Sequence, residues 1–68
     1  MTLKALRFQI LQLERDLAMN ALLLRRERRI SRQLDLMAVR CEIRKSIVYR
    51  QKLIIQILEA QVSFEEAA

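Results

Sequence analysis

The 68-residue sequence contains no glycine, no proline, no tryptophan and no histidine. Domains built from strands or loops use glycine and proline in their tight turns, because other residues adopt those backbone angles only at a cost. Their absence predicts an all-α chain that is helical almost from end to end. One helix of this length would extend about 100 Å. Neither that helix nor a two-helix hairpin could bury its own apolar surface, so we expect other helices to cover it.

The same absences argue against a chemical site. Cys41 is the only cysteine, so no intramolecular disulfide can form. Without histidine the thiol has neither a second metal ligand of the usual kind nor a base to activate it. The sequence has no glycine-rich loop and no pair of acids at a concave site. We therefore predict a protein that is not an enzyme and has no cofactor or metal, in which Cys41 is a small buried apolar residue.

Long hydrophobic runs are missing as well. No stretch approaches the roughly 20 apolar residues of a membrane-spanning helix. Arg7, Glu14 and Asp16 interrupt the N-terminal apolar pattern, which argues against a signal peptide. We expect an intracellular, cytoplasmic segment, excised from a longer rod unless Met1 is native. Cytoskeletal and centrosomal scaffolds are rich in such segments, so they are the expected setting.

The sequence does contain a heptad repeat. Every seventh residue from Leu6 to Val62 forms a column in which seven of nine members are apolar. A second apolar column lies three residues earlier and continues as far as Leu24, so residues 1–24 are predicted to form a narrow coiled-coil seam. Asn20 lies in the first column, where a buried asparagine would fix register and oligomer state. The predicted interface residues of this segment are Leu3, Leu6, Ile10, Leu13, Leu17 and Leu24.

A broader apolar face begins at Leu34. From Leu34 to Val62 four adjacent columns hold 17 positions, of which 12 are apolar. This is wider than a two-stranded seam requires, so residues 34–64 are predicted to pack in a multi-helix bundle, with residues 65–68 as a frayed tail. The predicted interface residues here are Leu34, Met37, Cys41, Ile43, Ile47, Val48, Ile54, Ile55, Ile57, Leu58 and Val62.

Residues 25–33 form an arginine-rich segment in which the second column changes sides, as if three residues had been inserted. One interpretation is a continuous helix whose coiled coil is locally overwound. The other is a turn, with Ser31 capping a second helix that begins near Arg32. Arginine favours helix, and both the capping box and a terminating glycine are missing. The fold is thus a long coiled-coil helix or a helical hairpin, assembling in either case into a multi-helix bundle.

Charge is distributed in blocks. The net charge is +1 over residues 1–24, +7 over 25–52 and −3 over 53–68. Such a middle block suits an acidic partner. The arginines within the broad apolar face are expected to pair with acids on a packed helix. The predicted basic contacts to a partner are Arg25, Arg26, Arg28, Arg29, Arg32, Arg40 and Arg44.

These patterns predict an oligomerisation or protein-interaction module of an intracellular scaffold. The module would associate with itself, or with another helical protein that is acidic. The alternative is a small basic helical bundle that binds RNA, because basic surfaces supply affinity for nucleic acid. Nucleic acid is the less favoured partner, since no aromatic residue lies near the arginines to stack on bases. A helix lying on a membrane surface is a further, weaker alternative.

Overall fold

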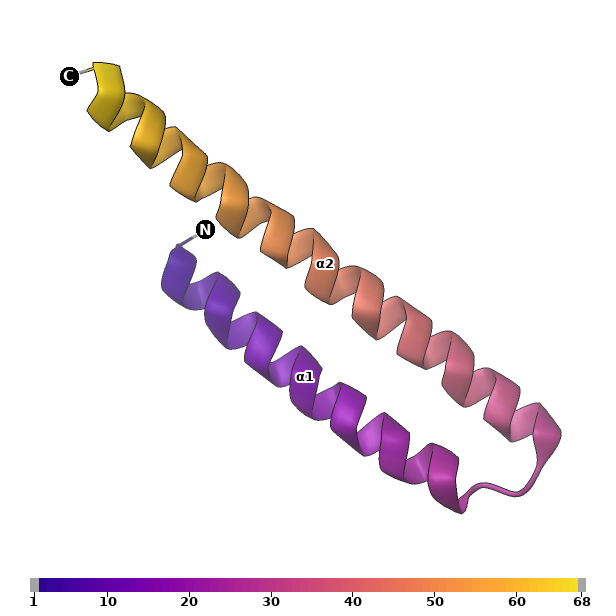
Figure 1. Ribbon diagram of the computed structural model, residues 1–68. Helices are drawn as coiled ribbons and strands as arrows, with labels where there is room; N and C mark the ends of the chain where they lie inside the picture. The colour runs from indigo at the N-terminus through magenta and orange to yellow at the C-terminus, as the bar shows by residue number, and fades with distance from the viewer. Residues whose placement is uncertain (1, 68) are drawn as a thin grey trace.

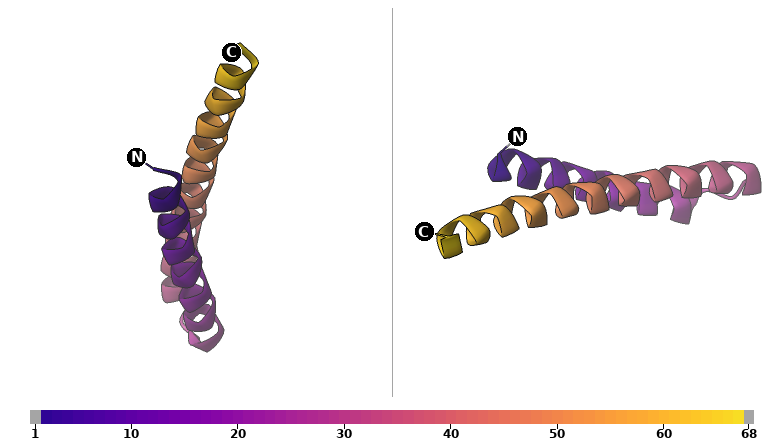
Figure 2. Two further views of the ribbon diagram at one scale, coloured as in Figure 1. Left: turned by 90° about the vertical axis from the view of Figure 1, so that its left-hand side faces the viewer. Right: turned by 90° about the horizontal axis from the view of Figure 1, so that it is seen from above.

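The computed structural model describes residues 2–67 and shows a helical hairpin (Figure 1). α1 spans Leu3–Arg26 and α2 spans Ile30–Ala67. The two helices run antiparallel and cross at a shallow angle (Figure 2). Residues 2–67 contain no strand, so the prediction of an all-α chain is confirmed. The molecule is a rod of 59 × 16 × 15 Å, in which the C-terminal end of α2 projects beyond the start of α1 (Figure 1).

α1 begins after Thr2, which acts as its N-cap. The backbone of Thr2 is extended, and its Oγ1 accepts a hydrogen bond from the backbone N–H of Ala5 at 3.1 Å. This satisfies one of the N–H groups that an α-helix leaves unpaired in its first turn. At the other end, Arg25 and Arg26 occupy the last turn, where positive charge interacts favourably with the helix dipole.

The chain turns at residues 27–29, so the hairpin is the alternative that forms and the continuous helix is not. Glu27 leaves the helical conformation with ψ at 127°, while its N–H still donates to the carbonyl of Leu23 at 3.0 Å. The prediction that Ser31 caps a helix beginning near Arg32 is wrong, because α2 begins at Ile30 and Ser31 lies in its first turn. The predicted overwinding of a coiled coil at residues 25–33 is wrong as well. The apolar column changes sides in this segment because the chain reverses direction there.

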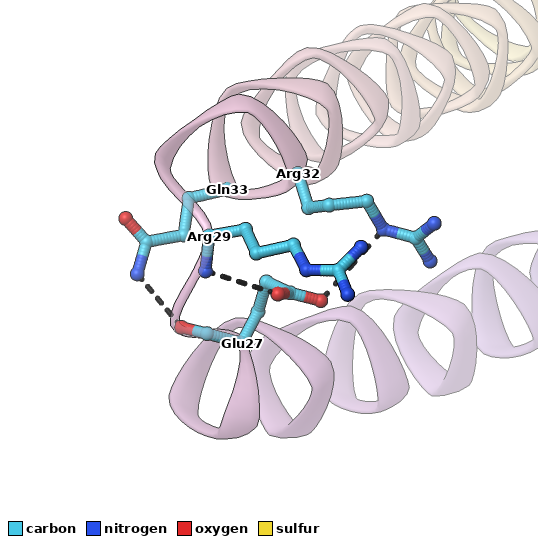
Figure 3. Close-up of polar contacts among 4 residues, drawn as sticks. All are labelled: Glu27, Arg29, Arg32 and Gln33. Carbon is cyan, nitrogen blue, oxygen red and sulfur yellow. Dashed lines mark hydrogen bonds and ion pairs between the residues drawn. The ribbon is translucent and has the colours of Figure 1, made fainter.

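Glu27 holds the turn through both its carboxylate and its carbonyl (Figure 3). Its Oε1 accepts from the backbone N–H of Arg29 at 3.1 Å, and its Oε2 lies 3.7 Å from Nε of Arg32. Its carbonyl accepts from Nε2 of Gln33 at 2.7 Å. The first turn of α2 contains no acidic residue. The carboxylate of Glu27 therefore supplies the negative charge that the N-terminal end of a helix favours.

We expect Glu27→Ala to lower the free energy of unfolding by about 1–2 kcal/mol, because the N–H of Arg29 loses its acceptor. Glu27→Gln is the matched control. It retains an amide oxygen for that N–H and loses only an ion pair with an exposed arginine, for a few tenths of a kcal/mol. Urea denaturation followed by circular dichroism at one protein concentration measures both changes. Equal losses in the two variants would contradict the assigned role of the hydrogen bond.

Candidate protein-interaction surface

One face of α1 packs against α2. Leu6 is 0% exposed and Asn20 is 4% exposed, and both lie on this face. Most of the rest of the face is half-buried and follows the two predicted heptad columns: Leu3, Ile10, Leu13, Leu17 and Leu24. The structure therefore places the predicted interface residues of the first segment against the second helix of the same chain.

α2 meets α1 through two of the four apolar columns. We call these positions the inner face, and all of them are half-buried: Gln33, Leu36, Arg40, Ile43, Ile47, Arg50, Ile54 and Ile57. Their spacing alternates between three and four residues, the pattern by which one side of a helix meets another helix. The predicted interface residues Ile43, Ile47, Ile54 and Ile57 are thus used within the hairpin.

The other two columns of α2 lie beside the inner face and remain exposed. We call them the outer stripe: Ile30, Leu34, Met37, Cys41, Arg44, Val48, Gln51, Ile55, Leu58 and Val62. Leu34 is 65% exposed and Ile55 is 52% exposed. Cys41 is exposed too, so the prediction that it is buried does not hold within one chain. The physical reason is that α1 covers only one side of α2.

Asn20 connects the two helices. Its Nδ2 donates to the backbone carbonyl of Leu36 at 2.9 Å, while its Oδ1 is buried without a hydrogen-bond partner. This position carries a leucine one and two heptads earlier, at Leu13 and Leu6. Asn20 is therefore placed to fix the register of α1 on α2 within one chain. This role leaves one buried oxygen without a hydrogen bond.

We expect Asn20→Leu to raise the free energy of unfolding by about 1 kcal/mol. The substitution removes the unsatisfied Oδ1 and adds apolar contact, whereas the carbonyl of Leu36 keeps its place in the helix. Asn20→Ala is the control, because it removes the same polar group without adding apolar surface. It should be neutral or destabilising. If thermal melts showed Asn20→Leu to be less stable than the wild-type chain, the interhelical hydrogen bond would contribute more to stability than the unsatisfied oxygen costs.

The arginines of the apolar face do not find the acidic partners expected of them. Arg50 donates from Nε to Oε1 of Gln9 at 2.9 Å and from Nη1 to the carbonyl of Ser46 at 3.2 Å. Nη1 of Arg40 is buried without a partner. Between residues 2 and 67, the ion pairs are Glu27 with Arg32 and Glu42 with Lys45. The face of α1 toward α2 offers apolar residues with Gln9 and Asn20, because the acids of α1, Glu14 and Asp16, are exposed.

The turn gathers positive charge at one end of the rod. Five of the predicted basic contacts lie within or beside it and are exposed: Arg25, Arg26, Arg28, Arg29 and Arg32. The other two are separate, since Arg40 lies on the inner face and Arg44 on the outer stripe. At the opposite end, α2 projects beyond α1 and carries Glu59, Glu65 and Glu66, all exposed (Figure 1). The rod is therefore basic at its turn and acidic at its open end.

The described part of the chain does not assemble a group of three or more side chains suited to holding a metal ion. Neither helix, over the same residues, has both the length and the apolar character required to cross a membrane. The surface with the most evident capacity for binding is therefore the outer stripe. No known protein family, curated protein or solved structure matches this chain.

Proposed function

We propose that this chain is a non-enzymatic association module, which acts by packing the outer stripe of α2 against further helices. One observation carries the proposal. Eight of the ten positions of the stripe are apolar, and all of them are exposed at heptad spacing along α2. Contiguous exposed apolar surface marks interaction sites, and heptad spacing is the pattern that fits another helix.

The area of exposed surface supports the same conclusion. The chain exposes 5861 Å² for a mass of 8.1 kDa. A compact monomer of this mass would expose roughly 4,500 Å². The excess is larger than the roughly 800 Å² that one partner buries in an interface of standard size. Association through the outer stripe would bring the surface of the hairpin closer to that of ordinary folded proteins.

In the cell, such a module would hold chains together in an intracellular scaffold. It would do so by associating with itself or by accepting an acidic helix beside its arginines. We propose cytoskeletal and centrosomal scaffolds as the setting, because helical rods are common in them.

Sedimentation equilibrium over a range of micromolar concentrations tests the proposal. We expect the chain to assemble, with a melting temperature that rises with protein concentration because association stabilises only the folded state. A monomer that melts cooperatively at one temperature whatever its concentration, and that binds no acidic helix, would overturn the proposal.

A second candidate function is RNA binding, and the arginines gathered at the turn favour it. In a continuous helix these side chains would point in many directions, whereas the turn places five of them at one end of the rod. A gel shift with a structured RNA tests this. The candidate requires an affinity that falls steeply with salt and that weakens when Arg28 and Arg29 are replaced by glutamine. If the double variant bound RNA with the affinity of the wild-type chain, RNA binding through the turn would be excluded.

A further inference from the structure

We infer that a second copy of this chain covers the outer stripe, with its α2 lying antiparallel across the first, so that two hairpins form a two-fold symmetric four-helix bundle. The inference rests on the proposed function and names the partner, its direction and its register. Two independent features support it, namely the spacing of the stripe and the distribution of charge, and the charges act also on the dipole of α2.

The spacing of the stripe fits one antiparallel register. When two copies of α2 cross near residue 46, every position of the stripe lies opposite a position of the same stripe. The opposed positions are Ile30 with Val62, Leu34 with Leu58, Met37 with Ile55, Cys41 with Gln51, and Arg44 with Val48. A shift of one heptad in either direction leaves two apolar positions at one end of the stripe without a counterpart. The register that uses the whole stripe is therefore unique among heptad registers.

The polar members of the stripe fall in its middle layers in this register. Arg44 and Gln51 lie near the two-fold axis, and apolar layers flank them on both sides. Both side chains are long enough to extend from the edge of an apolar stripe into water. The two ends of the bundle thus consist of apolar layers, and its middle layers are the most hydrated.

Charge selects the antiparallel direction. The same register places residues 59–66 of one copy beside residues 26–33 of the other, so that the acidic open end of each rod meets the basic turn of its partner. A parallel pair would instead place the five arginines beside the same five arginines. Single exposed ion pairs contribute little to stability. Complementary charge of this kind determines orientation more than it determines affinity.

The dipole of α2 supports the same direction. α2 has arginines around its N-terminal end and glutamates near its C-terminal end, which is the unfavourable arrangement at both ends. Its first turn holds no acid and its last turn holds no base. An antiparallel copy brings three glutamates to the N-terminal end of its neighbour and five arginines to the C-terminal end. It thereby supplies the positive charge that the C-terminal end of α2 lacks, and it adds to the single carboxylate of Glu27 at the N-terminal end.

Distances between spin labels test the direction and the register. Ser63 is exposed and lies outside the stripe. On a Cys41→Ser background, labels at Ser63→Cys should lie about 50 Å apart in the antiparallel dimer, because 34 residues at about 1.5 Å each separate them. In a parallel dimer they would lie within about 20 Å. A mixture of chains labelled at Ser63→Cys and chains labelled at Ser31→Cys should instead give a short distance.

The wild-type chain supplies a test that needs no substitution. In a parallel pair the two Cys41 side chains share one layer and would oxidise to a disulfide-linked dimer. In the antiparallel register they lie about 15 Å apart along the helix, beyond the reach of a disulfide. We expect oxidation with copper phenanthroline to give no covalent dimer at concentrations at which the chain sediments as a dimer.

The outcomes separate this inference from the proposed function. A dimer with a short distance between the Ser63 labels, or with a Cys41 disulfide, would overturn the antiparallel bundle and leave the association module in place. A chain that is monomeric alone but binds an acidic helix would also overturn the bundle only. A chain that binds neither itself nor an acidic helix would overturn both.

Discussion

The variant Ile55→Glu is expected to sediment as a monomer at concentrations at which the wild-type chain is assembled. Ile55 lies on the outer stripe and is exposed in the single hairpin, so a glutamate there remains in water as long as the chain is alone. Assembly would bury that carboxylate among apolar side chains without a partner. We expect this to weaken association by at least about 3 kcal/mol, or roughly 100-fold in the dissociation constant.

The matched control for this variant is Gln56→Glu. It changes the net charge by the same amount at the next position, which is exposed and outside both the inner face and the outer stripe. Lys52→Glu is a second control on the polar side of α2. Both should assemble as the wild-type chain does. If sedimentation equilibrium showed an equal loss of assembly in the controls, the outer stripe would not be the interface.

Thermal melts of Ile55→Glu give a second measurement. Because association stabilises only the folded state, the wild-type melting temperature should rise with protein concentration. In Ile55→Glu that dependence should disappear, and the helical signal should remain at low temperature. A melting temperature that still rises with concentration would show that another surface joins the chains.

The periodicity of the sequence predicted helical structure and the face of α1 that meets α2, because periodicity is a geometric property of the helix. The two columns of the first segment do form the face of α1 that meets α2, including Leu6 and Asn20. The identity of the partner could not be predicted in the same way. A heptad seam has the same pattern whether its partner is a second chain or the other half of the same chain. Only the turn decides between them.

The turn itself has weak local signals. Residues 27–29 contain neither glycine nor proline, and arginine favours helix. The available clues were the change of apolar column and Glu27, a charged residue in a mostly apolar column. The structure shows that the capping interactions come from Glu27 and Gln33, which are not a standard capping box. Long-range packing of α1 on α2 outweighs the loss of helix over three residues.

The division of the broad face into an inner face and an outer stripe could not be predicted from the sequence either. Between Leu34 and Val62 the inner columns carry three polar residues, Arg40, Arg50 and Gln61, and the outer stripe carries two, Arg44 and Gln51. Composition alone therefore does not say which half meets α1. The structure shows that the half with Arg40 and Arg50 meets α1, after a connection of three residues.

Ile47→Glu is expected to unfold the hairpin, whereas Ile55→Glu only dissociates it. The two isoleucines lie eight residues apart on the same helix, but Ile47 is half-buried on the inner face, where its contacts are with its own chain. A glutamate at this position loses apolar contact and brings a carboxylate against the leucines of α1. We expect the free energy of unfolding to fall by about 3 kcal/mol. A two-helix chain of this size has little more than that in reserve.

Far-ultraviolet circular dichroism of the two glutamate variants at one concentration separates these effects. Ile47→Glu should lose most of its helical signal, and Ile55→Glu should keep it as a monomer. Ile47→Leu is the control on the inner face, since it preserves volume and apolar character and should cost less than about 1.5 kcal/mol. If Ile47→Glu remained as helical as Ile55→Glu, the inner face would not hold the hairpin together. The assignment of the outer stripe as the free surface would then fail with it, because the two assignments divide one helix between them.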